Sequence, residues 1–256
     1  MGVCVFIIGA ILGSFYLVIG TRLPLKENVI TGRSRCDSCK KELKWYELIP
    51  LISYTIQLGK CRNCGKKISK EHLIMELATG ILFLVGYLYF DISLKLGIYL
   101  IIISVALIIF VSDFKYMIIL DSPLVIGSIL IIIIRYFEVG LTNTVYSVLY
   151  GIALFLVMYL IKIIGDKIYK RESLGGGDIK LCFLIGLTLG YPGIGFRLSL
   201  ISLVFAAFLA LPYAMATLYF NKKNELPFGP FLISSMIIMF VFIEKFTNLL
   251  VFFSLS

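Results

Sequence analysis

The sequence predicts an all-α polytopic membrane protein, with about eight transmembrane helices and a small four-cysteine zinc insert between the first and the second. Hydrophobic residues make up 60% of the 256 residues and charged residues only 15%, against about 45–50% and about 25% in ordinary soluble domains. The hydrophobic residues also stand in long runs, such as 98–111. A soluble core of this size cannot hold so many apolar side chains, so a water-soluble monomer is excluded.

Eight stretches approach the length and apolar character of a membrane-spanning helix, which needs about 20 mostly apolar residues. In chain order they are 2–20, 73–90, 96–113, 117–134, 141–164, 179–191, 198–220 and 228–252. The sixth is short and contains Gly186 and Gly190, so we expect it to tilt, shorten or be partly re-entrant. These assignments divide the chain into a first transmembrane helix at 1–20, an insert at 21–72 and a transmembrane core at 73–256.

Lysine and arginine are distributed unevenly between the loops. Of the 24, 20 fall at 22–70, 115, 162–180 and 222–223, all on one side of the predicted membrane. The four on the other side are Lys95, Arg135, Arg197 and Lys245. Because cytoplasmic loops carry the excess of positive charge, we expect both termini outside and the insert in the cytoplasm. The net charge of +9 then indicates anionic membrane lipids as partners and not nucleic acid.

Four of the six cysteines form two C-x-x-C pairs in the insert. Cys36 and Cys39 make the first pair, and Cys61 and Cys64 make the second, with 21 residues between the two pairs. This spacing is close to that of four-cysteine zinc sites, in which a closed tetrahedral set of thiolates is structural and leaves no position for catalysis. The alternative is a pair of redox dithiols or disulfides, which a reducing cytoplasm disfavours.

Two aspartates are placed at the cytoplasmic ends of predicted spans. Asp113 ends the third span, and Asp178 follows three glycines at the start of the sixth. Acidic residues at such positions are functional candidates, and two carboxyls at one depth are what an aspartic protease needs. The alternatives are a solvated charge at a helix end for Asp113, and a flexible turn with an N-cap for Asp178.

Residues 175–181 read GGGDIKL and resemble the G-x-G-D-x-K-L signature of the type IV prepilin peptidases, which are membrane aspartyl proteases. Further resemblances run along the chain at 13–15 with 22–24, in the two cysteine pairs, and at 45–54, 76–80, 113–121 and 226–230. The sequence departs from the family at Leu120, where proline usually precedes the second aspartate of the block, Asp121. We expect Asp121 to be orienting or structural and not catalytic, so this departure weakens the role of Asp121 more than the implied function.

The resemblance implies that Asp113 and Asp178 are the catalytic pair, that 73–256 is the protease core, and that the four insert cysteines bind zinc. It implies cleavage of the basic leader of type IV prepilins or pseudopilins at the cytoplasmic face of the bacterial inner membrane. Methylation of the new N-terminus from S-adenosylmethionine is implied by the resemblance alone. Glu76 is a candidate participant, or else a carboxylate that complements the helix dipole. We assign no chemistry to His72 or to residues 227–230.

Two other classes of function stay open at this point. A secondary transporter or ion channel also uses intramembrane aspartates and glycine-broken helices, but its sites lie near the midplane, in paired repeats. A membrane anchor or scaffold organised by the zinc insert would explain the cysteines and neither aspartate. The sequence leaves the oligomeric state open.

Overall fold

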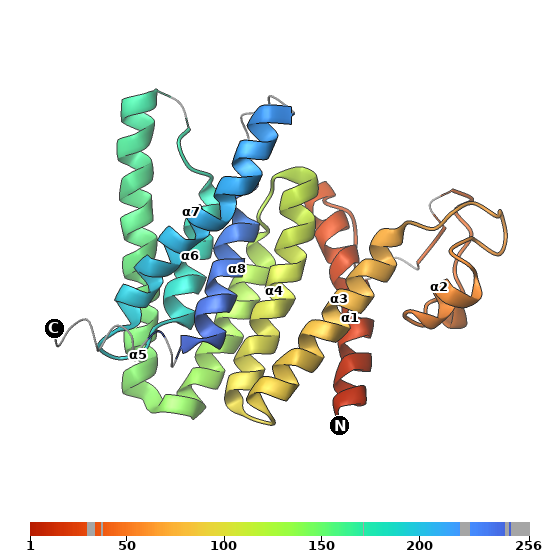
Figure 1. The fold of residues 1–256 in the computed structure, drawn as a ribbon, viewed down its shortest axis with the longest axis horizontal. Helices are drawn as coiled ribbons and strands as arrows, with labels where there is room; N and C mark the ends of the chain where they lie inside the picture. The colour runs from red at the N-terminus through yellow and green to blue at the C-terminus, as the bar shows by residue number, and fades with distance from the viewer. Residues whose placement is uncertain (30–33, 37, 171, 221–225, 244–245, 247–256) are drawn as a thin grey trace. The chain divides into compact units, whose positions relative to one another are not determined.

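The computed structural model describes all residues except 30–33, 37, 171, 221–225, 244–245 and 247–256 (Figure 1). The part of the chain that it describes is helical, with two isolated β-bridges in the insert and no strand. The predicted all-α class is confirmed. The chain forms two compact units, Met1–Leu96 and Gly97–Ser256, which are described separately below. The division at residues 21 and 73 stays a prediction.

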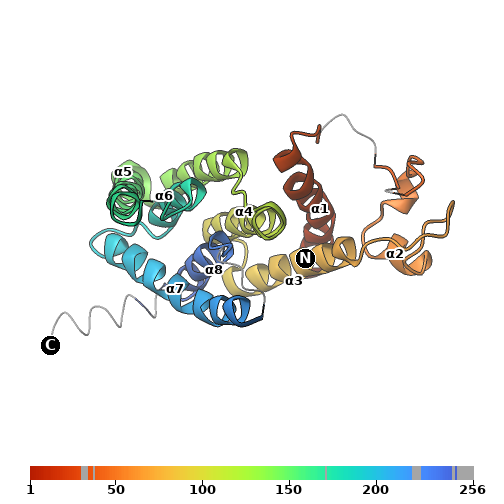
Figure 2. The ribbon, with the colours of Figure 1, turned by 90° about the horizontal axis from the view of Figure 1, so that it is seen from above.

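The first unit holds two long helices, α1 (Gly2–Arg22) and α3 (Lys70–Phe90), which lie side by side (Figures 1 and 2). Small residues let the two backbones approach closely: a Cβ added at Gly13 would lie 2.6 Å from the Thr79 hydroxyl oxygen. Ser69 caps α3 by accepting a hydrogen bond from the Glu71 N–H, which is why this helix begins at Lys70.

The insert between these helices contains three short helical segments. They are η1 (Leu23–Leu25), η2 (Trp45–Glu47) and α2 (Ile52–Ile56). The rest of the described insert is made of turns, which include one tight turn at each cysteine pair. A piece of chain with so little regular structure needs a cross-link such as a metal to fix it.

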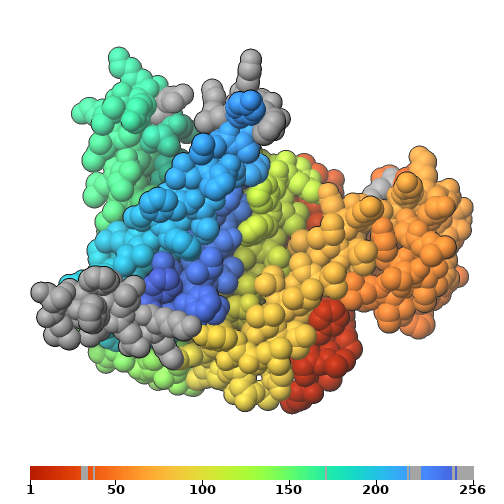
Figure 3. All heavy atoms as spheres, in the orientation of Figure 1, coloured from red at the N-terminus to blue at the C-terminus, as the bar shows by residue number. Residues whose placement is uncertain are grey.

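The second unit contains the remaining helices: α4 (Leu94–Tyr116), α5 (Asp121–Tyr169), α6 (Gly176–Thr188), α7 (Gly195–Phe220) and α8 (Gly229–Val241). Gly140 interrupts α5 with φ 78° and ψ 172°, a backbone conformation outside the helical region. The fourth and fifth predicted spans correspond to the two parts of α5 on either side of this glycine. Figure 3 shows α7 and α8 running together along one face of this unit.

In the described part of the chain, five helices are long and apolar enough to cross a membrane: Gly2–Leu25, Lys70–Phe90, Leu94–Tyr116, Asp121–Tyr169 and Gly195–Thr217. Since the fourth of these covers two predicted spans, six of the eight predictions fall on membrane-length helices. The sixth and eighth predictions fall on α6 and α8, which have 13 residues each. Part of the eighth, at 244–245 and 247–252, lies outside the described residues.

The fourth span begins later than predicted, at Asp121 and not at 117. Met117 has a φ of 55°, and Ile118 to Leu120 are not helical. This short connection keeps residues 117–120 out of both helices, although they are as apolar as the helix that follows. The helix predicted at 179–191 is present as α6, three residues earlier at each end, and its side chains at Leu181, Leu184 and Ile185 are fully buried; that it crosses the membrane stays a prediction.

Candidate active site

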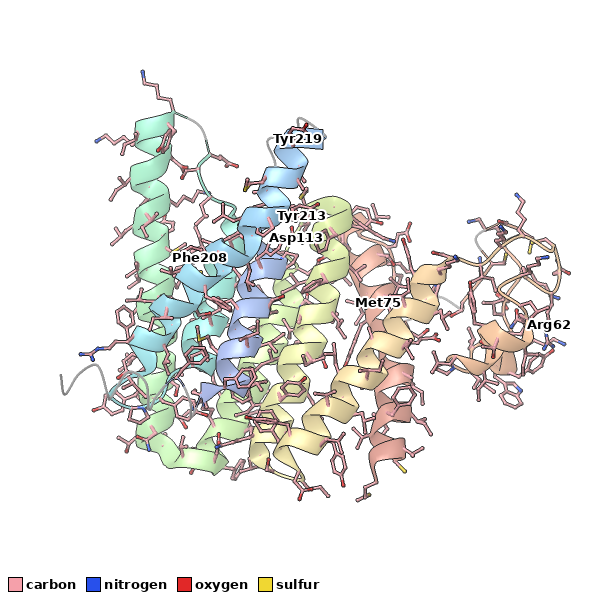
Figure 4. The ribbon with its side chains drawn as sticks, viewed as in Figure 1. Arg62, Met75, Asp113, Phe208, Tyr213 and Tyr219 are labelled. Carbon is pink, nitrogen blue, oxygen red and sulfur yellow. The ribbon has the colours of Figure 1, made fainter. Side chains whose placement is uncertain are left out.

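The structure brings together the two aspartates that the sequence singled out. Asp113 lies in the last turn of α4 and is buried (Figure 4), whereas Asp178 lies in the first turn of α6 and is half-buried. Their carboxylates are close enough to interact electrostatically. One oxygen of each, Asp113 Oδ2 and Asp178 Oδ1, is buried without a hydrogen-bond partner among the described residues. Such buried oxygens call for an explanation, and a water or a substrate between the carboxyls would supply one.

Glycine backbone approaches both carboxylates. A Cβ added at Gly175 would lie 2.9 Å from Asp178 Oδ2, and one added at Gly229 would lie 2.9 Å from Asp113 Oδ2. Both distances are shorter than those at which real Cβ atoms occur, so any side chain at these positions would push on a carboxylate. The glycines therefore keep the space beside the two carboxylates open, as expected for those before Asp178.

Gly229 gives residues 227–230 a place in the site that the sequence analysis did not assign. It is the first residue of α8, and its backbone N–H contacts the Asp113 carboxylate. The contact places Gly229 beside Asp113, and the absence of chemistry at 227–230 stays a prediction. In the sequence, the only sign of this contact was a glycine that lies between two prolines. The contact could not be predicted from it, because Gly229 and Asp113 are 116 positions apart.

Asp121 lies apart from the catalytic candidates and pairs with a lysine. Its two carboxylate oxygens accept hydrogen bonds from Lys180 Nζ at 2.7 and 2.8 Å. Asp121 is the first residue of α5, and Lys180 follows Asp178 by two residues on α6. The ion pair therefore links the turn that carries Asp178 to the start of the neighbouring helix.

Arg135 contacts the opposite end of α6. Its guanidinium donates a hydrogen bond to the Thr188 carbonyl and lies 4.5 Å from the centre of the Tyr191 ring. The prediction that Arg135 is a loop charge is therefore corrected, because it is fully buried within α5. Nearby, the Ser147 hydroxyl donates to the Gly190 carbonyl at 2.6 Å. Polar contacts from α5 thus hold both ends of α6.

The four insert cysteines form the predicted cluster. All four sulfur atoms lie within 4.8 Å of one another, and Sγ of Cys36 and Cys64 are 3.9 Å apart. When four sulfur atoms bind one zinc ion tetrahedrally, with Zn–S distances of about 2.3 Å, the sulfur atoms lie about 3.8 Å from one another. The backbone amide of Lys41 and the side-chain amide of Asn63 lower the pKa of the Cys39 thiol to about 6. Against the backbone amide of Lys66, desolvation and the neighbouring cysteines raise the pKa of the Cys64 thiol to about 11. These residues fit a metal ion.

Glu76 connects the insert to α3. It is buried, and its Oε2 accepts a hydrogen bond of 2.8 Å from the backbone N–H of Leu51, the residue that precedes α2. Leu51 has a φ of 63°, a backbone conformation that is uncommon for residues other than glycine. Glu76 therefore has a structural partner that could not be identified from the sequence.

These features define a multi-pass helical membrane protein with a paired-carboxylate site and a separate four-thiol cluster. Residues 7–90 match the family model of the bacterial Peptidase A24 N-terminal domain, and residues 100–253 match that of the type IV leader peptidase family. The chain belongs to the type IV leader peptidase family, as the sequence motifs indicated.

Curated relatives cover nearly the whole chain. It is 34% identical over 238 residues to the prepilin leader peptidase/N-methyltransferase of Bacillus subtilis, covering 93% of this chain and 92% of the relative. It is 33% identical over 248 residues to the protein of the same name from Vibrio cholerae, covering 91% and 94%. No solved structure matches the chain. The transporter alternative finds no support among these relatives.

Proposed function

We propose that this protein is a membrane aspartic endopeptidase that cleaves the basic leader from type IV prepilin-like proteins, with Asp113 and Asp178 as its catalytic pair. The observation that carries the proposal is the meeting of these two carboxyls from separate helices, each with a buried oxygen that has no partner among the described residues. The names of the curated relatives agree with this activity and with this substrate class.

The chemistry needs one proton shared by the two carboxyls. The ionised carboxylate takes a proton from a water molecule, whose oxygen attacks the scissile carbonyl carbon, while the protonated partner donates its proton to the carbonyl oxygen. The tetrahedral intermediate then collapses: the C–N bond breaks and a proton passes to the leaving amine. Asp113 and Asp178 are equivalent in this scheme until a substrate is bound.

The glycines beside the carboxylates favour a peptide as substrate. Gly175 and Gly229 present backbone and no side chain next to Asp178 and Asp113, so an extended peptide has room to approach both. A prepilin combines a short basic leader with an apolar helix. The leader would meet the carboxyls at the helix ends, while the apolar helix stays in the bilayer.

The charge distribution supports a cytoplasmic site. Asp113 and Asp178 lie at the ends of α4 and α6 that adjoin the basic segments at 115 and 162–180. By the positive-inside bias these ends face the cytoplasm. We therefore place the protein in the bacterial inner membrane with its active site toward the cytoplasm, where the basic leader of a prepilin is held.

For the insert we infer a structural zinc ion bound by Cys36, Cys39, Cys61 and Cys64. Zinc bound by four thiolates supplies a cross-link, and it has no open position for a reacting group. The two cysteine turns are formed by backbone bonds, from the Cys36 N–H to the Lys41 carbonyl and from the Cys61 N–H to the Lys66 carbonyl. The ion would join these turns and fix the intervening segment.

A second activity, methylation of the new N-terminus from S-adenosylmethionine, is proposed on the names of the relatives. Glu76 is a weaker candidate for this step than the sequence suggested, because its Oε2 already accepts the Leu51 N–H. Its contact favours a role in holding the insert against α3.

The test is incubation of the purified protein, in lipid nanodiscs, with the prepilin-like proteins of the same genome, followed by mass spectrometry. We expect loss of the basic leader at a single site and, if the second activity is present, a methylated N-terminus on the product. An intact substrate with every candidate prepilin would contradict the proposed cleavage.

A further inference from the structure

The insert exposes several large apolar side chains that no described residue covers. Trp45, Ile52, Ile56 and Leu58 are 78%, 54%, 65% and 84% exposed; we call these four residues the apolar face of the insert. Ile52 and Ile56 are four residues apart on α2 and so project from the same side of the helix. The segment with Trp45, η2, packs against α2. Exposed apolar groups gathered on one small domain mark an interaction site.

The hydrogen bond between Leu51 and Glu76 indicates how deep the start of α2 lies in the membrane. The backbone N–H of Leu51, the residue before α2, donates a hydrogen bond of 2.8 Å to Glu76 Oε2. Glu76 lies six residues after Lys70, the start of α3. At a rise of about 1.5 Å per residue this is about 9 Å along the helix. The 21 residues of α3 are about 31 Å long, which is close to the thickness of the hydrocarbon core. The predicted span begins at 73, so Glu76 lies three residues, about 4.5 Å, inside its first residue. The start of α2 therefore lies level with the first turn of that span, close to the boundary between headgroups and acyl chains.

The insert that carries the apolar face is rich in positive charge. Residues 22–70 contain 12 Lys and Arg against four Asp and Glu. Beside Trp45, the ring of Tyr46 has Lys44 at 5.8 Å and Arg62 at 5.5 Å from its centre, and Figure 4 shows Arg62 at the outer end of the insert. Tryptophan and tyrosine flanked by lysine and arginine are typical of segments that lie in the headgroup region of anionic membranes.

We propose that the apolar face of the insert docks into the headgroup and upper acyl region of a bilayer that contains anionic lipids. Trp45, Ile52, Ile56 and Leu58 enter the apolar edge of the bilayer, and lysines and arginines of the insert, Lys44 and Arg62 among them, bind lipid phosphates. The insert is then a membrane-embedded platform and not a domain surrounded by water. The proposal goes beyond the protease function and does not depend on it.

Trp45 is the only tryptophan of the chain, so the fluorescence of the unmodified protein reports on the proposed contact. The protein is reconstituted into liposomes of phosphatidylcholine and phosphatidylglycerol, with and without acyl chains brominated near the headgroup. We expect roughly a twofold loss of Trp45 emission with the brominated lipids, because bromine quenches only on contact with the ring and the face lies about 5–10 Å into the boundary. Brominated phosphatidylglycerol should quench more than brominated phosphatidylcholine at the same fraction.

Two matched variants calibrate this signal. Trp45→Phe with Lys41→Trp places the indole on an exposed position near the first cysteine pair and should be quenched by aqueous iodide only. Trp45→Phe with Leu149→Trp places it on the exposed apolar side of α5 and should be quenched by brominated lipid only. If Trp45 behaves like the variant at position 41, the proposal is overturned. Protection from both quenchers also overturns it, because protein would then cover the face.

Discussion

Lys180 on α6 binds both carboxylate oxygens of Asp121 at the start of α5, at 2.7 and 2.8 Å. The two side chains are 51% and 61% exposed, and exposed ion pairs contribute only about 0–1 kcal/mol to stability. The pair nevertheless joins α5 to the turn of α6 that carries Asp178. We therefore expect this ion pair to affect the position of Asp178, the proposed catalytic group, more than the stability of the fold.

Replacing Lys180 by methionine tests this positioning role. We expect a loss of cleavage rate of roughly tenfold, because small displacements of a reacting group are costly, and a free energy of unfolding lowered by less than about 1 kcal/mol. Asp121→Asn breaks the same ion pair and should retain appreciable activity, with a loss similar to that of Lys180→Met. Rates by mass spectrometry and thermal unfolding in nanodiscs measure the two effects. If both variants cleave at the wild-type rate, the ion pair does not position Asp178.

The glycines beside the carboxylates give a second prediction. Gly229→Ala and Gly175→Ala each place a Cβ 2.9 Å from a carboxylate oxygen, so we expect a cleavage rate lowered at least about tenfold through displacement of that group. Gly176 is the matched control, because a Cβ there meets no atom within 4 Å and the residue is helical. Equal losses for alanine at 175, 176 and 229 would show that open space beside the carboxyls is not what these glycines provide.

Metal content tests the cysteine cluster. We expect one zinc per chain in freshly purified protein, and chelation should loosen the insert because metal binding and folding of such a segment are coupled. Cys36→Ser with Cys61→Ser should lose the metal, whereas Cys4→Ser, at an exposed cysteine outside the cluster, should keep it. Metal analysis by mass spectrometry decides. Full zinc retention in the double variant would exclude these ligands.

Arg135 gives a prediction on stability. Arg135→Met leaves the Thr188 carbonyl without its donor in a buried place, which typically costs about 1–3 kcal/mol. We therefore expect a clearly lower unfolding temperature than for Lys180→Met. Arg197→Met, which removes an exposed arginine, should leave the unfolding temperature unchanged. If the variants at 135 and 197 unfold at the same temperature, the buried contact does not stabilise α6.

The sequence was sufficient for the features that depend on local pattern. Apolar run length predicted the helices, C-x-x-C spacing predicted the cysteine cluster, and the position of Asp113 and Asp178 at span ends predicted their meeting. What it could not predict depends on contacts between distant residues. The pairs Lys180 with Asp121, Arg135 with Thr188 and Gly229 with Asp113 are 59, 53 and 116 residues apart.

Burial of a charge was the least predictable of these features. A charge count assigns Arg135 to a loop, since a cation in an apolar helix is costly. The carbonyl and the aromatic ring that compensate this cost become visible only when α5 and α6 are packed together. The same holds for Glu76, whose partner is the backbone amide of a turn in the insert.

The central claim, that Asp113 and Asp178 together cleave a prepilin leader, is tested most directly by the cleavage rates of Asp113→Asn and Asp178→Asn. Each variant keeps the shape of the side chain and removes one of the two proton-transfer roles. We predict that each lowers the rate by at least about 10³-fold while the unfolding temperature stays near that of the wild type, and that Asp121→Asn remains active. Substantial turnover by either folded variant would contradict the account.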